Sequence, residues 1–338
     1  VLAGAVLLDG GLAAHAAPRV QERRFLFGSP AEVLVAPRGE DAPVANAIAE
    51  VMAGWQRMNE RWNAWKPGDV GTLNRAFAAG HSAATTPALL ALIRSAAQLE
   101  AQSFGLFNAG IGGAVGTWGF HDDVMRPGAR PDGAVLARWR KARPSLAQLE
   151  IRGHEVYSPN PQLQLDFGAY AKGVAIDWAL TRLQMRGIDD ALVNLGGNLA
   201  AMRCDGPGWR IGIRDPAGDG LIAQLLTQGR EAVVTSGSYE RFRLLDGERC
   251  THILDPQTAA PAGELVSVTV VHACAARADA AATALLVAGR QGWRRVARRM
   301  GVAQVLIVDR HLRGEVTAPL AQRLQFADPI WRASISVV

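Results

Sequence analysis

Helical and strand-like hydrophobic spacings follow one another along most of the chain. Residues 24–37 predict two short strands around a Gly-Ser-Pro turn, and residues 43–65 carry apolar side chains at helical spacing. Thr86 followed by Pro87 predicts the start of a second helix, with Thr86 as its N-cap. Residues 104–120 contain too many glycines for an ordinary helix or strand, so we predict a loop there that exposes its backbone.

The centre of the chain has the clearest pattern. Residues 163–188 predict a short strand, a turn at Asp166 to Gly168, and a helix that ends at Gly187. Residues 191–203 predict two strands joined by a Gly-Gly turn. Further strands are predicted at residues 149–157, 209–213, 232–234, 266–271 and 303–308, and a further helix at residues 276–287. This mixture, without internal repeats or low-complexity linkers, predicts one α+β domain over residues 21–338.

Composition narrows the class of protein. Hydrophobic residues make up 49% and charged residues 20% of the 338 residues, which is typical of a folded globular protein. The formal charge is +5, but only three of the 36 basic residues are Lys, and the Arg clusters at 137–143 and 294–299 fall in helical patterns. We interpret these clusters as solvated helix faces and expect no nucleic-acid partner. Three cysteines without metal-ligand spacing argue against a structural zinc site.

The first residues suggest export. Residues 1–17 contain an apolar run that is too short, and too interrupted by Asp9, to span a bilayer. Small residues follow within the segment, and Ala14-His15-Ala16 matches a signal-peptidase site. We expect the remnant of an export signal at residues 1–17 and a periplasmic protein. An ordinary apolar N-terminal strand or helix remains the alternative.

Three side chains stand out as candidates for chemistry. Asp279 and Thr283 are four residues apart on a predicted helix, so their oxygens share one face and suit magnesium, whose remaining ligands would be phosphate and water. A helix-start Asp and a back-bonded Thr explain the same pair structurally. His252 lies between a strand and an Asp-Pro corner, which suits an oriented general base, although a buried structural His fits equally.

Other motifs are weaker when taken singly. Lys172 falls in the first turn of its helix, where a cation is disfavoured by roughly 0.3–1 kcal/mol unless an anion binds there. The small polar residues Thr235, Ser236 and Ser238 form either an anion-holding turn or a plain strand connection. The Trp65 and Trp118 rings either stack on a flavin or fill the core.

Taken together, five motifs carry a family resemblance. They are LDFGAYAKGVAIDWA, LVNLGGN, VVTSGSYERF, HILDPQT, and SVTVV with ADAAATALLV. In their order and spacing they resemble the FAD:protein FMN transferases, the ApbE family. FNAGIGGAVGTWGF also looks like a flavin loop of that family, and FLFGSP and WKPGDVGTLN match its first flavin contacts. The resemblance implies an α+β fold of mixed sheets and packed helices around an open cleft.

The resemblance also implies roles for individual residues. Magnesium would be bound by Asp279, Thr283 and the backbone carbonyl of Ala169, and His252 would be the catalytic base. The FAD substrate would be lined by Phe27, Trp65, Leu106, Phe107, Asn108, Asp166, Lys172 and the backbone of Leu254. The sequence departs from the family pattern at Phe27, Asn108, Gly113 and Ala259, where the family usually has Met, Asp, Pro and Gly.

The implied reaction is transfer of FMN from FAD to a Thr or Ser hydroxyl of an acceptor protein, with release of AMP. A respiratory electron-transfer protein is the expected acceptor, with peripheral contact to membrane complexes. Two alternatives stay open, namely an FAD pyrophosphatase that uses water as acceptor, and a periplasmic flavin-binding assembly factor for a respiratory metalloenzyme.

Overall fold

A nine-stranded sheet forms the centre of the protein. The computed structural model describes residues 5–7, 20–36, 41–122 and 124–338. The strand order is β2 (Val20–Leu26), β3 (Ser29–Val35), β7 (Asp190–Leu195), β8 (Asn198–Arg203), β11 (Glu231–Gly237), β16 (Leu265–His272), β17 (Gln304–Asp309), β18 (Gly314–Val316) and β20 (Ile335–Val337). Neighbouring strands are antiparallel except for the parallel pair β18 and β20.

Both faces of this sheet are buried. Val33 and its partner Val193 belong to a large core with the helices α1 (Asp41–Arg61), α6 (Ala171–Met185) and α7 (Ala275–Met300). Leu34 and its partner Leu192 point to the opposite face and pack in a second core. Because successive strand residues face opposite sides, the nearly continuous apolar runs of these strands serve both cores at once.

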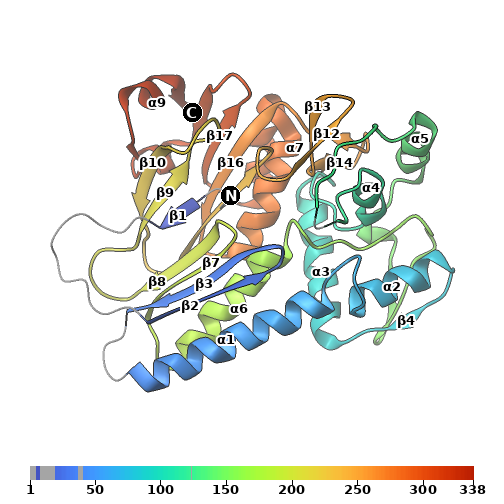
Figure 1. Cartoon of the computed structure of the whole chain (residues 1–338), viewed down its shortest axis with the longest axis horizontal. Helices are drawn as coiled ribbons and strands as arrows, with labels where there is room; N and C mark the ends of the chain where they lie inside the picture. The colour runs from blue at the N-terminus through green and yellow to red at the C-terminus, as the bar shows by residue number, and fades with distance from the viewer. Residues whose placement is uncertain (1–4, 8–19, 37–40, 123) are drawn as a thin grey trace.

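A second sheet covers the face opposite the helices (Figure 1). Its strand order is β1 (Ala5–Leu7), β9 (Arg210–Arg214), β10 (Leu221–Leu226) and β19 (Gln325–Phe326). Two short helices, α8 (Ala318–Ala321) and α9 (Pro329–Ser334), lie near the C-terminus. The export signal predicted at residues 1–17 lies outside the described residues apart from Ala5–Leu7.

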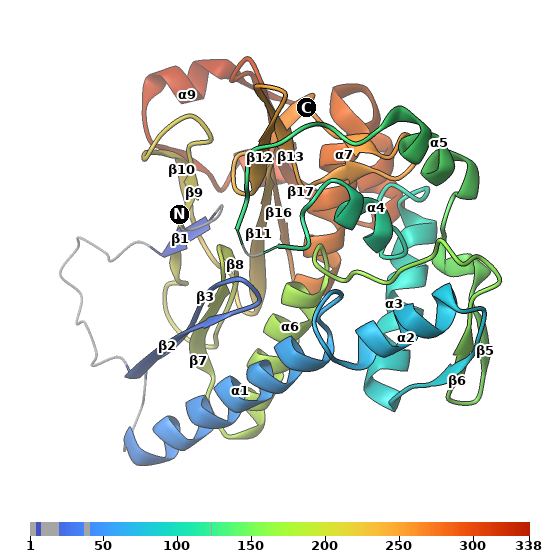
Figure 2. The ribbon, with the colours of Figure 1, turned by 45° about the vertical axis from the view of Figure 1, so that its right-hand side comes forward.

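A smaller lobe lies beside the helices of the main layer, on the right in Figure 2. It contains α2 (Asp69–Ala78), α3 (Pro87–Gln102), α4 (Gly112–Thr117), α5 (Gly133–Ala142), the 3-10 turn Leu146–Gln148, and a sheet of β4 (Ala83–Ala84), β6 (Glu155–Tyr157) and β5 (Glu150–Arg152). Two hairpins, β12 (Phe242–Leu245) with β13 (Glu248–Thr251) and β14 (Leu254–Asp255) with β15 (Ala260–Pro261), join α4 and α5 around a third apolar cluster. The candidate residues lie on segments of this lobe, on the neighbouring α6, α7 and β11, and, for Phe27, in the turn between β2 and β3.

The predicted α+β class is confirmed, and three local predictions are wrong. The glycine-rich segment 104–120 contains the helix α4, because its small residues permit close contact: a Cβ at Gly112 would lie 2.8 Å from the carbonyl oxygen of Gln164. Thr235 and Ser236 belong to β11 rather than to a turn, and Thr235 Oγ1 hydrogen-bonds Thr269 Oγ1 on β16 at 2.9 Å. The strand expected before Asp166 is a single bridge between Gln164 and Ile111.

The N-cap prediction for α3 is confirmed, since Thr86 Oγ1 accepts a hydrogen bond from the Leu89 N–H at 3.3 Å. The helix predicted at 276–287 is longer than expected and bends at Gly289, which has a φ of 66°. Within the described part of the chain, no helix is both long enough and apolar enough to span a membrane. All three cysteines are free thiols.

Candidate functional site

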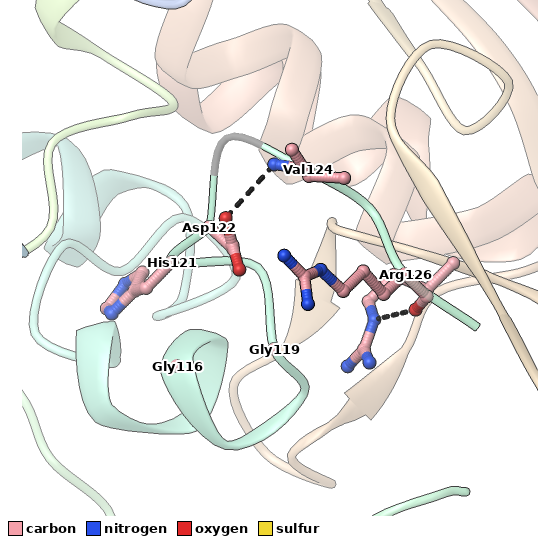
Figure 3. A pocket seen from close by; sticks show the side chains of 7 residues that line it. Gly116, Gly119, His121, Asp122, Val124 and Arg126 are labelled. Atoms are coloured by element: carbon pink, nitrogen blue, oxygen red, sulfur yellow. Dashed lines mark hydrogen bonds between the residues drawn. The ribbon is translucent and has the colours of Figure 1, made fainter. Parts of the chain in front are cut away.

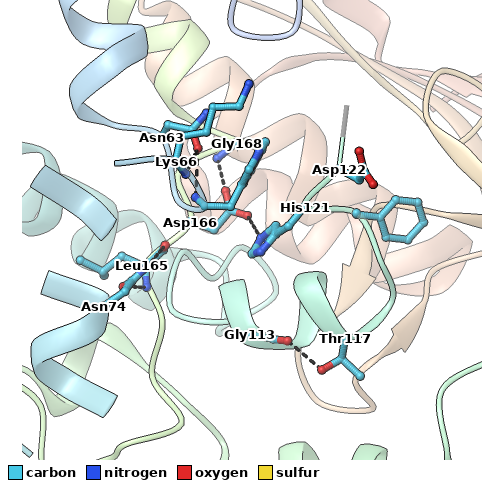
Figure 4. Close-up of polar contacts among 12 residues, drawn as sticks. Asn63, Lys66, Asn74, Gly113, Thr117, His121, Asp122, Leu165, Asp166 and Gly168 are labelled. Carbon is cyan, nitrogen blue, oxygen red and sulfur yellow. Dashed lines mark hydrogen bonds and ion pairs between the residues drawn. The ribbon is translucent and has the colours of Figure 1, made fainter. Parts of the chain in front are cut away.

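Hydrogen bonds within the protein fix the position of Asp166 in the absence of a ligand. The side chain of Asn74 on α2 bonds both backbone groups of Leu165, accepting from its N–H at 2.6 Å and donating to its carbonyl at 2.9 Å (Figure 4). One carboxylate oxygen of Asp166 accepts from the Gly168 N–H at 2.8 Å, and the other lies 3.1 Å from His121 Nε2. Burial raises the pKa of Asp166, but the hydrogen bond and charge of His121 with the Gly168 N–H outweigh it, so the pKa is lowered.

Trp65 and His121 form a stacked pair at this site. Their ring centroids are 4.7 Å apart and their planes differ by 20°. The guanidinium carbon of Arg241 lies 5.9 Å from the centre of the Trp65 ring. Trp118, the other tryptophan considered for flavin stacking, is buried in the third apolar cluster and donates its indole N–H to the Ala259 carbonyl. Of the two, only Trp65 therefore borders the polar site.

His252 lies between the strands β13 and β14, as expected from the sequence. Its Nδ1 is 2.9 Å from the carbonyl oxygen of Arg241, and its ring meets Phe120 edge-on at 6.2 Å. A carbonyl only accepts hydrogen bonds, so Nδ1 carries the proton and Nε2 presents a lone pair. Burial, with the charges of Arg241 and Lys172, lowers the pKa of His252 to about 4. The side chain is therefore a neutral proton acceptor at neutral pH.

Asp279 is a buried carboxylate on α7, at the point where this helix meets α6. Its Oδ2 accepts from the Gly173 N–H on α6 and its Oδ1 from the Asn198 side-chain amide, both at 2.9 Å. Close helix contact requires glycine here, because a Cβ at Gly173 would lie 2.5 Å from the Ala275 carbonyl oxygen. Burial raises the pKa of Asp279 against the opposing charge of Lys172.

Two further oxygens adjoin this carboxylate. Thr283 Oγ1 lies one helical turn along α7 and is 3.3 Å from Ser236 Oγ on β11. Asn198 Oδ1 is buried and has no hydrogen-bond partner within the described residues. An orphaned buried oxygen next to a carboxylate and a hydroxyl is a donor set that suits a hard cation such as magnesium. Among the described residues no group of three or more His, Cys, Asp or Glu side chains is arranged to hold a metal ion, so a cation at Asp279 would need phosphate or water as well.

Lys172 lies at the second position of α6, as predicted. Its ammonium group makes no hydrogen bond or ion pair with any described residue, yet its charge acts on both Asp279 and His252. A half-buried cation without a partner, at the positive end of a helix dipole, favours an anionic ligand. Ala169, whose carbonyl is the third expected metal ligand, is two residues before this helix.

The remaining predicted flavin contacts have clear structural roles. Phe27 lies in the turn between β2 and β3 with a φ of 52°, and its N–H donates to Asn59 Oδ1. Leu106 is half-buried and Phe107 is buried in the main core. Leu254 opens β14, and its side chain packs in the third cluster.

The departures from the family pattern fit their surroundings. Asn108 donates its side-chain N–H to the Pro144 carbonyl at 2.8 Å, which an Asp carboxylate could not do. The Trp139 ring packs against Gly113, where a Cβ would lie 2.2 Å from it. Ala259 adopts a φ of 55°, a conformation that glycine reaches at no steric cost.

Three residues of the site were missed by the sequence reasoning, namely His121, Asn198 and Arg241. His121 directly follows the Trp-Gly-Phe segment, whereas Asn198 and Arg241 lie inside the motifs LVNLGGN and VVTSGSYERF without a role that the sequence assigns to them. Their partners are far away in the sequence, so no local pattern indicates what these three side chains contact.

The fold and the site together define an α+β protein with a neutral histidine, an unpaired lysine and an acid–hydroxyl pair around a polar site. The chain belongs to the ApbE family, whose model matches residues 27–307. It is 40% identical to a FAD:protein FMN transferase of Rhodobacter capsulatus over 340 residues, covering 100% of this chain and 65% of that protein. The chain thus spans about two thirds of the length of this relative.

Other similar proteins agree. A FAD:protein FMN transferase of Treponema pallidum is 30% identical over 322 residues, which are 90% of this chain and 88% of that protein. A crystal structure of the ApbE protein of Thermotoga maritima superposes with a TM-score of 0.82 at 25% identity, covering 90% of this chain and 99% of that one. The flavinyl transferase ApbE of Pseudomonas stutzeri gives 0.74 at 28% identity, with 87% and 91% covered. The predicted family is confirmed.

Proposed function

We propose that this chain transfers FMN from FAD to a Thr or Ser hydroxyl of an acceptor protein and releases AMP. The observation that carries the proposal is the neutral His252, whose free Nε2 lies in a site with the unpaired cation of Lys172. The names of the similar proteins support the choice of FAD as substrate and of a protein as acceptor.

The reaction needs one proton transfer and one phosphoryl displacement. His252 Nε2 takes the proton of the acceptor hydroxyl, whose oxygen then bonds to the phosphorus of the FMN half. The pyrophosphate bond breaks, and its electron pair leaves on the phosphate oxygen of AMP. Lys172 stabilises the negative charge of the pyrophosphate, helped by the positive end of the α6 dipole.

Magnesium fits this site and would be held by Asp279, Thr283 and the Ala169 carbonyl. When bound, it would neutralise the pyrophosphate and stabilise the charge on the leaving AMP. The orphaned Asn198 Oδ1 is consistent with a polar ligand at this point. The contacts of Asp279 with Gly173 and Asn198 keep the carboxylate in place whether or not a cation is present.

One assay separates transfer from its alternatives. The purified chain is incubated with FAD, magnesium and a Thr-containing acceptor protein, while AMP release and covalent flavin fluorescence of the acceptor are followed. We expect equal amounts of AMP and labelled acceptor. AMP without labelling would favour an FAD pyrophosphatase, and bound FAD without AMP would favour a flavin-binding assembly factor.

We further propose that the protein is exported and acts in the periplasm on a respiratory electron-transfer protein. The apolar run and small residues of segment 1–17 support export. Fractionation of the producing bacterium should recover a chain lacking roughly these residues from the periplasm. Recovery of uncleaved protein from the cytoplasm alone would contradict this proposal.

A further inference from the structure

The imidazole of His121 covers an aromatic surface of the site. It stacks on Trp65 with a centroid separation of 4.7 Å, which is at the short end of the range of about 4.5–7 Å for stacked rings. A second planar ring cannot enter between them. A ligand ring that stacks on this face of Trp65 therefore has to take the place of His121.

Trp65 has features of a ligand-binding wall rather than of a core residue. The ring is half-buried, and its indole nitrogen is buried without a hydrogen-bond partner among the described residues. A buried N–H without an acceptor is costly unless a ligand or water supplies one. The ring therefore offers a stacking face together with an unused donor.

The space beside His121 offers its imidazole ring a second position. His121 borders a hollow of about 220 Å³, which Gly116, Gly119 and Arg126 also line and Trp65 does not (Figure 3). In this structure the imidazole ring is held by stacking on Trp65 and by Asp166 Oδ2, which lies 3.1 Å from its Nε2. Its Nδ1 lies against Gly116, where a Cβ would come within 2.9 Å. The absence of a side chain at Gly116 thus leaves room for the ring.

We propose that His121 is a positioning residue that serves as a movable cover of the flavin-stacking face of Trp65. It lies on the indole ring when no flavin is bound, and turns into the hollow beside Gly116 when an isoalloxazine ring stacks there. This inference rests on the proposed function in one respect, namely that the ligand carries a flavin ring. The cover selects for such a ligand, because a ligand without a large planar ring gains nothing from displacing it.

The cover reduces apparent flavin affinity by the fraction of molecules that are open. A stacked aromatic pair corresponds to about a 2- to 10-fold change in an equilibrium constant. His121→Ala should therefore bind FAD and FMN about 2- to 10-fold more tightly than the wild type. ADP, which lacks the flavin ring, should bind with unchanged affinity.

Isothermal titration of the full chain with FAD, FMN and ADP, without acceptor protein, tests this proposal. His121→Gln tests the stacking ring separately from the polar contact, because the Gln amide still reaches towards Asp166 but cannot stack on Trp65. It should behave like His121→Ala. His154→Ala, at an exposed position in the turn between β5 and β6, is the matched control and should bind all three ligands as the wild type does.

Three outcomes would overturn the cover. Weaker flavin binding in both His121 variants would show that the flavin contacts the imidazole directly. Unchanged flavin binding would show that His121 has no part in the site. An equal change in ADP affinity would indicate a general distortion of the protein. The test is independent of catalysis. If the wild type binds FAD but never labels an acceptor, the proposed transfer fails while the affinity difference still decides the role of His121.

Discussion

Replacing His252 by Ala tests both the proposed base and its unusual environment. The backbone N–H of His252 also donates to the Arg241 carbonyl at 3.1 Å, so that carbonyl keeps a partner in the variant. The fold should survive. A positioned base contributes about 10²- to 10⁴-fold, so FMN transfer should fall by that factor while FAD affinity stays within a few-fold.

The pH dependence follows from the pKa of His252, which is lowered from 6.5 to about 4. Above pH 4 the ring is neutral and able to accept a proton, so the transfer rate should stay level from pH 8 to pH 5. Stability has a matching dependence. Between pH 6.5 and 4 the unfolded chain binds a proton that the folded chain does not, so stability is lost as the pH falls through this window.

The expected loss is measurable. A pKa lowered from 6.5 to about 4 corresponds to about 3 kcal/mol of stability in full, of which about 2 kcal/mol is lost between pH 7.5 and 5. Denaturant unfolding at the two pH values should show this extra loss in the wild type and not in His252→Ala. In-gel flavin fluorescence of the acceptor gives the rate. A transfer rate that falls with a midpoint near pH 6.5, or unchanged labelling by the variant, would refute the reasoning.

Four other substitutions test the supporting structure. Asp279→Asn should abolish magnesium-dependent AMP release while circular dichroism shows a folded protein; near-normal release would remove Asp279 from the metal site. Gly173→Ala should lower the free energy of unfolding by about 1–3 kcal/mol and reduce turnover, because its methyl group meets the Ala275 carbonyl, and an unchanged unfolding midpoint would contradict the close contact. Thr86→Ala should cost about 1 kcal/mol of stability without changing FAD affinity, since it removes only the α3 cap. Ala259→Gly should add about 0.5–1 kcal/mol in the same unfolding assay by relieving the positive φ, and a loss of stability would show that the Ala methyl group matters more.

The elements that could be predicted are those whose signals are local. Neighbouring residues predict the N-cap of α3 and the glycine that ends α6. The apolar runs on either side of the Gly-Gly turn predict the two strands that the structure has there. Residues 112–117 could not be predicted as helix from propensity, because their glycines are required by contacts with distant segments. The packing of Trp139 against Gly113 is one such contact, and neither residue alone signals it.

The residues of the candidate site likewise fall into those with a local sequence signal and those without one. Asp279 and Thr283 were found because helical spacing places them on one face, and Lys172 because its position in the first turn is unfavourable without an anion. Asn198 and His121 were missed because their roles come from tertiary contacts with Asp279 and Asp166. A pattern in one segment carries no information on which distant carboxylate it will meet.

Arg241 shows how the separate parts of the site depend on one another. Its carbonyl accepts from His252 Nδ1 and so sets which nitrogen of the base is free. Its guanidinium group donates to the carbonyls of Phe120 and Asp122, on either side of His121, and lies near the Trp65 ring. The same residue therefore orients the proposed base and holds the backbone from which the proposed cover projects. Both hydrogen bonds come from one terminal nitrogen, Nη2, so one end of the guanidinium group holds the backbone on both sides of His121. The position of the proposed base and the shape of the aromatic wall are thus set by one side chain and one carbonyl, which would couple the proposed flavin binding and the proposed proton transfer structurally.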